Sequence, residues 1–161
     1  MIKQIAYDSP IGRLLLVQDD WGICRICQMN PEDETPEAQS SSLLEQAAWA
    51  LEEYFAGRRE TFSFPLSMHG TAFEKRVWQT LLDIPYGETR TYGQLAAQLG
   101  MLKGARAVGG ACSRNPLLIA VPCHRVIASS GALTGFAAGM QAKRSLLALE
   151  GHAIENNRIR T

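Results

Sequence analysis

Residues 115–127 read NPLLIAVPCHRVI, an apolar run that is interrupted by proline, cysteine, histidine and arginine. The apolar part has the length and composition of a buried strand bounded by turn residues. Pro122 has no backbone N–H, so we expect regular strand pairing to break directly before Cys123 and His124. The stretch therefore predicts a buried strand that ends on a thiol with an imidazole beside it.

The Cys123–His124 pair has a chemical and a structural interpretation. A thiol attacks only as the thiolate, and histidine can promote deprotonation directly or through water when a third group orients its ring. Adjacent residues on a strand point to opposite faces, so the two side chains touch only if the chain bends there. The pattern alone favours the structural interpretation, a buried cysteine beside a histidine whose hydrogen bonds are satisfied within the fold. Free cysteine is among the most buried residue types.

The chain has 161 residues, enough for one ordinary domain or two small ones with a real core. The N-terminus lacks a signal-peptide pattern, and no run approaches the roughly 18 apolar residues needed to cross a bilayer. We therefore expect a soluble, cytoplasmic protein with no membrane partner. Its four cysteines are too few and too unevenly spaced for a disulfide framework, so we expect free thiols in a reducing compartment.

The net charge of zero hides a split between the two halves of the chain. Residues 1–72 carry five Lys/Arg against eleven Asp/Glu, whereas residues 73–161 carry eleven against five. This asymmetry indicates two functional units and makes the basic half a candidate for a polyanionic partner. Solvated surfaces that merely differ in charge would give the same numbers.

Residues 1–70 read as an antiparallel meander followed by a helix and a linker. Turn-like residues separate three apolar segments, at 2–7, 13–18 and 23–28. After an acidic loop, helical spacing begins at Leu43 and stops at Gly57, where a glycine just past the helix end would lie.

Residues 71–161 read as a mostly helical domain. Thr71-x-x-Glu74 and Thr91-x-x-Gln94 fit capping boxes and predict helices over about 72–82 and 92–99. A short connection leads from the second helix into ARAVGGACSRN, a short helix rich in small residues. This is the helix-turn-helix pattern, which indicates DNA binding or close packing against a neighbouring helix. Three basic residues favour DNA: Lys103, Arg106 and Arg114.

From Thr71 to Gly151 the chain resembles the O6-alkylguanine-DNA alkyltransferase family, also called methylated-DNA–protein-cysteine methyltransferases. Its PCHRV signature stands at Pro122–Val126, preceded by TYGQLAAQLG, ARAVGG and Asn115-Pro116 and followed by LLALEG, in the family's order. The resemblance implies an α+β fold in two domains. Residues 1–70 would form a small antiparallel sheet plus a helix, and residues 71–161 a mostly helical domain with the helix-turn-helix and an active-site PCHR strand.

The resemblance also implies an enzyme of DNA repair. It would flip an alkylated guanine out of duplex DNA and move the alkyl group onto Cys123, irreversibly and once per chain. His124 would act as a base through a bridging water, and Glu150 would orient His124. Tyr92 would hydrogen-bond the departing guanine, and the main-chain carbonyls of Cys123 and Val126 would bind its exocyclic amine. No cofactor and no metal is implied.

The partner implied is double-stranded DNA that contains O6-alkylguanine. Unstacking a base leaves a gap in the duplex, and Arg106 stands where the family fills that gap with an arginine. Small residues on its helix suit the minor groove. The other candidate DNA-binding residues are Tyr92, Ala105, Gly109 and Arg114. Asn115, in the turn before the strand, would act as a structural hinge between that helix and the strand. We expect a monomer, and the sequence leaves cooperative binding on DNA open.

The candidate base pocket consists of Val126, Phe136, Ala137 and Cys112, and it departs from the family pattern. Phe136 occupies a position that is tyrosine in many members, so stacking is kept and a polar contact is lost. Ala137 stands where other members have serine, so only its backbone N–H could face the guanine oxygen. Cys112 lies near the expected pocket wall, where we interpret it as a small apolar filler.

Cys24 and Cys27 form a C-x-x-C pattern without a partner pair, so the sequence favours ordinary strand packing over a zinc site. Two alternatives to alkyl transfer remain. A DNA-binding regulator without transfer chemistry would lack the acceptor cysteine, whereas Cys123 is present. A cysteine hydrolase would turn over repeatedly, whereas a thioether has no easy route back to the thiol.

Overall fold

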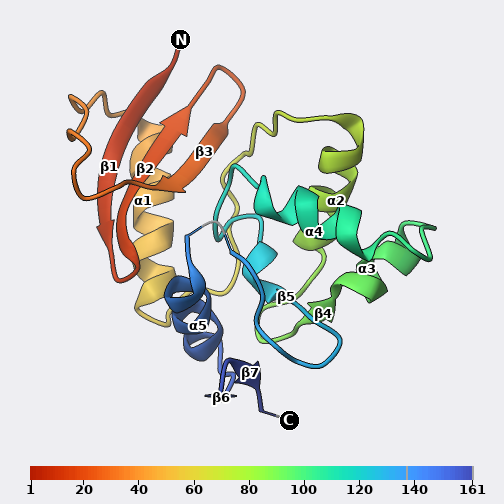
Figure 1. The fold of residues 1–161 in the computed structure, drawn as a ribbon. Coiled ribbons are helices and arrows are strands. Elements are labelled where there is room, and N and C mark those ends of the chain that lie inside the picture. The colour runs from red at the N-terminus through yellow and green to blue at the C-terminus, as the bar shows by residue number, and fades with distance from the viewer. Residues whose placement is uncertain (137, 161) are drawn as a thin grey trace. The chain divides into compact units, whose positions relative to one another are not determined.

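A computed structural model describes residues 1–136 and 138–160 of the chain. The chain folds into two compact units (Figure 1). The first unit comprises Met1–His69 together with Pro116–Leu118, and the second comprises Gly70–Asn115 together with Ile119–Thr161. The short segment 116–118 therefore belongs to the first unit, although it lies in the second half of the sequence.

The first unit contains a three-stranded antiparallel sheet in the order β1-β2-β3, as the meander pattern predicts. Its strands are β1 (Lys3–Ser9), β2 (Gly12–Gln18) and β3 (Ile23–Gln28), with an irregularity in the β2–β3 register between Val17 and Gln18. Helix α1 (Ser42–Phe55) packs against all three strands. Its apolar stripe is buried, and the hydroxyl of Ser41 caps it by accepting a 3.1 Å bond from the Leu44 N–H.

Two segments cover the free edge of β3. Residue Leu66 bridges to Ile23, and Leu117 bridges to Ile26, both in parallel orientation. The Ile23 N–H donates to the Pro65 carbonyl at 2.9 Å, and a Cβ on Gly22 would lie 2.6 Å from that oxygen. Only glycine fits this close approach, and the covered edge cannot pair with another chain.

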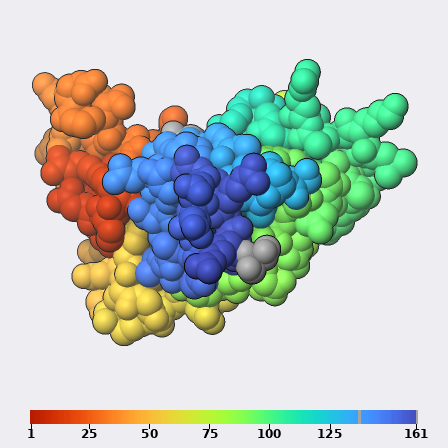
Figure 2. Space-filling model, turned by 60° about the horizontal axis from the view of Figure 1, so that its bottom comes forward, coloured from red at the N-terminus to blue at the C-terminus, as the bar shows by residue number. Residues whose placement is uncertain are grey.

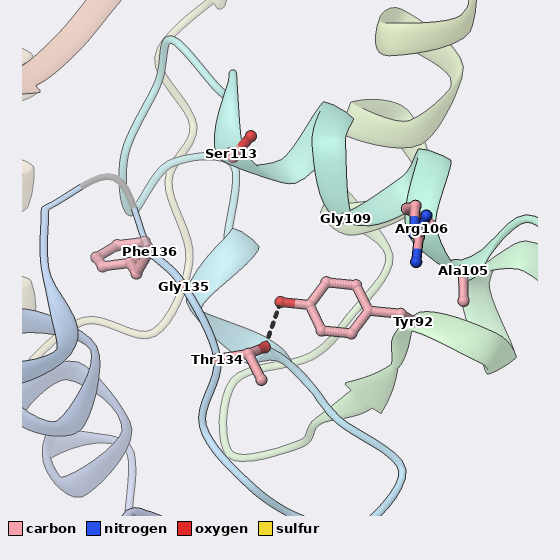
Figure 3. Close-up of a pocket in the computed structure, with 8 residues that line it drawn as sticks. All are labelled: Tyr92, Ala105, Arg106, Gly109, Ser113, Thr134, Gly135 and Phe136. Atoms are coloured by element: carbon pink, nitrogen blue, oxygen red, sulfur yellow. Dashed lines mark hydrogen bonds between the residues drawn. The ribbon is translucent and has the colours of Figure 1, made fainter.

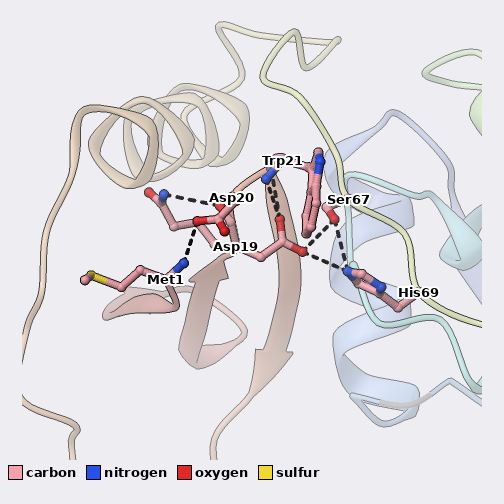
Figure 4. Close-up of polar contacts among 8 residues, drawn as sticks. Met1, Asp19, Asp20, Trp21, Ser67 and His69 are labelled. Atoms are coloured by element: carbon pink, nitrogen blue, oxygen red, sulfur yellow. Dashed lines mark hydrogen bonds and ion pairs between the residues drawn. The ribbon is translucent and has the colours of Figure 1, made fainter.

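A polar cluster ties the end of the first unit to the β2–β3 turn (Figure 4). The buried carboxylate of Asp19 accepts a bond from the Ser67 hydroxyl at 2.7 Å and contacts His69 Nε2 at 2.8 Å. Its other oxygen accepts from the backbone N–H groups of Trp21 and Gly22. Burial alone would raise the pKa of Asp19, but these hydrogen bonds outweigh it and hold the pKa below its ordinary value.

The second unit is built on four helices: α2 (Ala72–Leu82), α3 (Tyr92–Gln98), α4 (Ala105–Ser113) and α5 (Met140–Leu149). Both predicted capping boxes are formed, with Thr71 and Glu74 at the start of α2 and Thr91 and Gln94 at the start of α3. Helix α4 packs against both α2 and α3, which completes the predicted helix-turn-helix. In Figure 2 the chain around residues 100–110 projects from the surface, and Leu102 there is 91% exposed.

The Pro122–Val126 signature differs from the predicted strand. Cys123–Arg125 form a single 3-10 turn, η1, closed by the Arg125 N–H donating to the Pro122 carbonyl at 3.0 Å. The reason is Pro122, which cannot donate to a ladder and turns the chain at φ −83° and ψ 63°. The predicted buried strand before Pro122 is also absent: Leu117 makes one isolated bridge, and residues 118–121 form turns and a bend. Strand pairing begins only at β5 (Val126–Ile127), which runs parallel to β4 (Arg90–Thr91).

The chain approaches this turn through a strained residue. Ile119 is 1% exposed and has a φ of 72°, a conformation that a β-branched side chain rarely adopts. The second unit ends in a hairpin of β6 (Ile154–Glu155) and β7 (Arg158–Ile159), which packs on a small apolar cluster around Leu147. None of the helices among the described residues is long and apolar enough to span a membrane.

Candidate active site

The thiol of Cys123 lies at the first position of η1 and is almost completely buried. The side-chain amide of Asn115 donates to its sulfur at 3.1 Å and to the Val121 carbonyl at 2.7 Å. Asn115 thus ties the end of α4 to the approach to the cysteine. Burial raises the pKa of Cys123 to about 11, although the Asn115 bond and the nearby Lys143 cation act in the opposite direction. The thiol is therefore held protonated until a base removes its proton.

The bend at η1 lets His124 point into a buried charged network. His124 Nε2 lies 2.7 Å from one oxygen of Glu150, and both side chains are inaccessible to solvent. Arg125 donates to both Glu150 oxygens, at 2.7 and 3.1 Å, and to the Ile84 carbonyl at 2.7 Å. A carboxylate that accepts from a guanidinium keeps its charge, so it accepts the Nε2 proton of a neutral imidazole.

This arrangement fixes which nitrogen of His124 is basic. With the proton on Nε2, the lone pair lies on Nδ1, which has no hydrogen-bond partner among the residues that the structure describes. Burial lowers the pKa of His124, and Glu150 offsets part of that effect. The network therefore holds a neutral imidazole in one orientation, on the residue that directly follows Cys123 in the sequence.

Lys143 is a second buried cation beside the thiol. Its ammonium donates to the carbonyls of Val126 at 2.7 Å and Thr134 at 2.9 Å, and its side chain is inaccessible to solvent. Burial lowers the pKa of Lys143 to about 8, and the two nearby thiols, Cys123 and Cys112, oppose that shift. The lysine fixes the loop before Phe136 against β5 and favours a negative charge on the sulfur.

A cavity of about 620 Å³ opens between α3, α4 and the loop 134–136 (Figure 3). The Tyr92 hydroxyl lies 2.9 Å from the Thr134 hydroxyl, and Figure 3 shows the two side chains pointing at one another. The Phe136 ring also lies edge-on to the His124 ring, with centroids 6.4 Å apart. The lining residues are Tyr92, Ala105, Arg106, Gly109, Ser113, Thr134, Gly135 and Phe136.

Small residues on α4 keep this cavity open. A Cβ on Gly109 would lie 3.7 Å from the Tyr92 ring, so any larger side chain would fill the space in front of it. Arg106 is exposed at the rim, one turn before Gly109. Arg114, in contrast, pairs through Nε with Glu74, the residue that completes the capping box of α2. An open, mostly apolar cavity with an exposed arginine at its rim can hold a planar ligand. The buried Cys123 is not one of its lining residues, but the Phe136 ring, which lines the cavity, contacts the ring of the neighbouring His124.

Comparison with known proteins identifies the family. Residues 72–152 match the DNA binding domain of 6-O-methylguanine DNA methyltransferase, and residues 2–68 match the ribonuclease-like domain of the same family. The chain belongs to the 6-O-methylguanine DNA methyltransferase family.

Full-length relatives support this assignment. The methylated-DNA–protein-cysteine methyltransferase of Methanosarcina acetivorans is 46% identical over 149 residues, which cover 90% of this chain and 96% of the relative. That of Mycobacterium leprae is 46% identical over 159 residues and covers 96% and 95%. Among solved structures, Mycobacterium tuberculosis O6-methylguanine methyltransferase matches with a TM-score of 0.84 at 43% identity and 93% coverage of both chains. Mycobacterium tuberculosis OGT in complex with DNA matches with a TM-score of 0.82 at 44% identity and 90% coverage of both chains.

Of the thirteen site residues expected from the sequence, five line the cavity of this methyltransferase: Tyr92, Ala105, Arg106, Gly109 and Phe136. Cys123, His124 and Glu150 lie in the buried network instead. Val126 and Cys112 are buried and do not line the cavity, and the Val126 carbonyl already accepts a bond from Lys143. Burial raises the pKa of Cys112 to about 12, in keeping with an apolar filler. Ala137 lies outside the described residues.

The sequence interpretation missed several residues that the structure brings to the site. Arg125 belongs to the PCHRV signature and could have been singled out as a charge that needs a buried partner. Lys143 lies three and four residues before Leu146 and Leu147, so helical spacing places it on the apolar face of α5, a signal that the sequence interpretation did not use. Three cavity residues were also missed: Ser113, Thr134 and Gly135.

Cys24 and Cys27 are free thiols on β3, half-buried in the sheet of the methyltransferase. Within residues 1–136 and 138–160, no group of three or more His, Cys, Asp or Glu side chains is placed to hold a metal ion.

Proposed function

We propose that this chain repairs DNA by transferring the alkyl group of O6-alkylguanine to Cys123, irreversibly and once per chain. The observation that carries the proposal is the oriented pair at η1. A buried thiol held by Asn115 is followed directly by a neutral His124, whose Nε2 is tied to Glu150 and whose Nδ1 faces no other partner among the described residues. A nucleophile, a base and a group that orients the base are the elements of an activated thiol.

The proposed reaction is a displacement at the alkyl carbon. His124 Nδ1 takes the proton of the Cys123 thiol, directly or through a water molecule. The sulfur then forms a bond to the alkyl carbon as the bond from that carbon to guanine O6 breaks. The electron pair stays on the guanine, which regains one proton, so the products are a Cys123 thioether and an unmodified guanine. The thioether has no proton to lose and no good leaving group, which is why the reaction ends after one turnover.

The cavity is the proposed site of the alkylated base. Phe136 and Tyr92 both line this cavity and offer rings that a guanine could contact, and the Tyr92 hydroxyl can donate to the leaving base. The main-chain carbonyl of Cys123 accepts the Val126 N–H, and that of Val126 accepts from Lys143, so each keeps one lone pair for the exocyclic amine.

The helix-turn-helix is the proposed DNA surface. Ala105 and Gly109 keep the exposed face of α4 small enough for a minor groove, and Arg106 stands at the rim where an unstacked base would leave a gap. Arg114 would contribute phosphate attraction while it stays paired with Glu74. All four cysteines are free, which fits a reducing compartment such as the cytoplasm.

Intact-mass measurement tests the proposal. After incubation with excess duplex that contains O6-methylguanine, the protein should gain one methyl group, and peptide mapping should place it on Cys123. Cys123→Ser should gain no methyl group over the same time, which corresponds to a transfer rate at least about 10³-fold lower than that of the parent. It should bind the duplex as tightly as the parent. Release of more than one equivalent of repaired DNA per chain would favour a hydrolytic enzyme instead. DNA binding without any mass gain would favour a regulator.

A further inference from the structure

The contact between Tyr92 and Thr134 joins two elements that are distant in the sequence. Tyr92 is the first residue of α3, whereas Thr134 lies in the loop between β5 and α5, and their hydroxyl oxygens are 2.9 Å apart. Both side chains line the cavity (Figure 3). The contact is polar, it lies where the base would bind, and the reaction proposed above gives it no task.

A phenol hydroxyl carries one proton, so its direction decides what it can do. If the Tyr92 proton pointed at Thr134, the phenol could only accept a bond from the guanine. If the Thr134 hydroxyl donates to the Tyr92 oxygen instead, the Tyr92 proton is free to point into the cavity. A hydrogen bond received by the phenol oxygen also makes its own proton a better donor.

The backbone around Thr134 is fixed well enough to hold such a direction. The Thr134 carbonyl accepts a bond from Lys143 Nζ at 2.9 Å, and the same ammonium holds the Val126 carbonyl of β5 at 2.7 Å. The 2.9 Å contact allows either hydroxyl to donate, and burial raises the pKa of Tyr92 while a bond from Thr134 to the phenol oxygen acts in the opposite direction. The loop is thus anchored from one side while its hydroxyl reaches the tyrosine from the other.

We propose that Thr134 is a positioning residue for alkyl transfer, which donates a hydrogen bond to the Tyr92 oxygen and so directs the Tyr92 proton at a ring nitrogen of the departing guanine. This inference rests on the proposed function of the cavity. As the bond from the alkyl carbon to O6 breaks, negative charge develops on the guanine. A donor that is already aimed at the ring stabilises that charge without reorganisation. In this scheme the Thr134 hydroxyl acts only through Tyr92, and its bond to the phenol leaves the contact with the base to Tyr92.

Single-turnover rates at saturating duplex test the inference. Thr134→Val keeps the shape of the side chain and removes the hydroxyl, so transfer should slow about three- to tenfold, the effect of one lost hydrogen bond. Thr134→Ser keeps the hydroxyl and should restore most of the rate. The matched control is Thr80→Val in α2, because the Thr80 hydroxyl donates to the Arg76 carbonyl at 2.9 Å and Thr80 does not line the cavity. This control should transfer at the parent rate.

A double-mutant cycle shows whether Thr134 acts through Tyr92. In a Tyr92→Phe background the phenol is gone, so adding Thr134→Val should change the rate by less than about twofold. Equal slowing in both backgrounds would overturn the inference, and so would a normal rate for Thr134→Val with Tyr92 present. If valine lowers the melting temperature, Thr134→Ala enters the same cycle in its place. A parent protein that gains no methyl group would reject the proposed function itself, whereas a parent that reacts while Thr134→Val is unaffected rejects only the role of Thr134.

Discussion

The two units each contain a histidine paired with a carboxylate, and the two pairs differ in what surrounds them. In the first unit His69 Nε2 lies 2.8 Å from Asp19, and its side chain is 65% exposed. In the second unit His124 Nε2 lies 2.7 Å from Glu150, and neither side chain is exposed. The two contacts are almost equal in length, so the contact itself cannot explain why only one of them lies at the candidate active site.

Burial and the neighbouring groups make the difference. The Asp19 carboxylate also accepts from Ser67 and two backbone N–H groups, so it ties chain segments together. Glu150 instead accepts from Arg125, and the pair lies where burial lowers the pKa of His124. A solvated imidazole can exchange protons with water from either nitrogen. A buried one keeps a single tautomer, and that is the property a base needs.

The largest contrast should come from neutralising the two carboxylates in turn. Glu150→Gln removes the charge that holds the Nε2 proton of His124, so methyl transfer to Cys123 should slow by about 10²-fold at saturating DNA. Asp19→Asn is the matched control in the first unit and should transfer at the parent rate. Single-turnover methylation by intact mass measures both variants.

The Glu150 variant also leaves Arg125 buried without a counter-charge, which should lower the free energy of unfolding by about 3–5 kcal/mol. Rates should therefore be compared at a temperature where circular dichroism shows both variants folded. Equal slowing in the two variants would mean that the carboxylates act through stability alone. A parent-like rate for folded Glu150→Gln would remove Glu150 from the orientation of His124.

A variant outside the buried network sharpens the contrast. Arg106 is exposed at the cavity rim, and its proposed task arises only when the base starts inside a duplex. Arg106→Ala should slow transfer from duplex about ten- to hundredfold and leave the reaction with free O6-methylguanine nearly unchanged. Glu150→Gln should slow both reactions alike. Single-turnover rates on the two substrates, with duplex at saturation, separate the two kinds of effect.

Arg106→Lys is the control for charge, because it keeps the cation and removes the planar group that can stack. A lysine variant as fast as the parent on duplex would assign the effect to phosphate attraction. Slowing of the free-base reaction by Arg106→Ala would instead place Arg106 in the base pocket or in the fold.

The sequence predicts those parts of the fold that depend on neighbours in the chain. The capping boxes at Thr71 and Thr91 form because each threonine and its glutamate or glutamine partner lie three residues apart. The meander follows for the same reason, since its strands are joined by short turns. The break at Pro122 was expected because proline has no N–H to donate, but the buried strand expected before it was wrong: residues 118–121 form turns and a bend, and Cys123–Arg125 form a 3-10 turn. A short apolar run has the same pattern in a buried strand and in a buried irregular segment.

The rest of the site depends on contacts between distant residues. Thr134 reaches Tyr92 across 42 positions, and Arg125 reaches the Ile84 carbonyl across 41. Helical spacing places Lys143 on the apolar face of α5, but the carbonyls it holds come from β5 and the loop after it. No periodicity or spacing in the sequence encodes these pairs, so only the family resemblance could indicate part of the site in advance.

The smallest predicted effect is on stability, and it concerns the pair in the first unit. Hydrogen bonds hold the pKa of Asp19 below its ordinary value, which is about 3.9 in unfolded chains. A depressed carboxyl pKa contributes stability that is present above the unfolded value and is lost as the pH falls below it. Asp19→Asn should therefore lower the free energy of unfolding by about 1–3 kcal/mol at pH 7, with a smaller difference from the parent below about pH 4. Urea denaturation at pH 7, 5 and 3.5 measures this difference.

Asp20→Asn is the neighbouring control, because Asp20 is 66% exposed and pairs only with the N-terminal amine among the described residues. A loss that is the same at all three pH values, or one that Asp20→Asn reproduces, would contradict the role of the Asp19 charge. If the loss follows the predicted course while methyl transfer stays at the parent rate, the His69 pair is a structural tie and only the His124 pair serves the reaction.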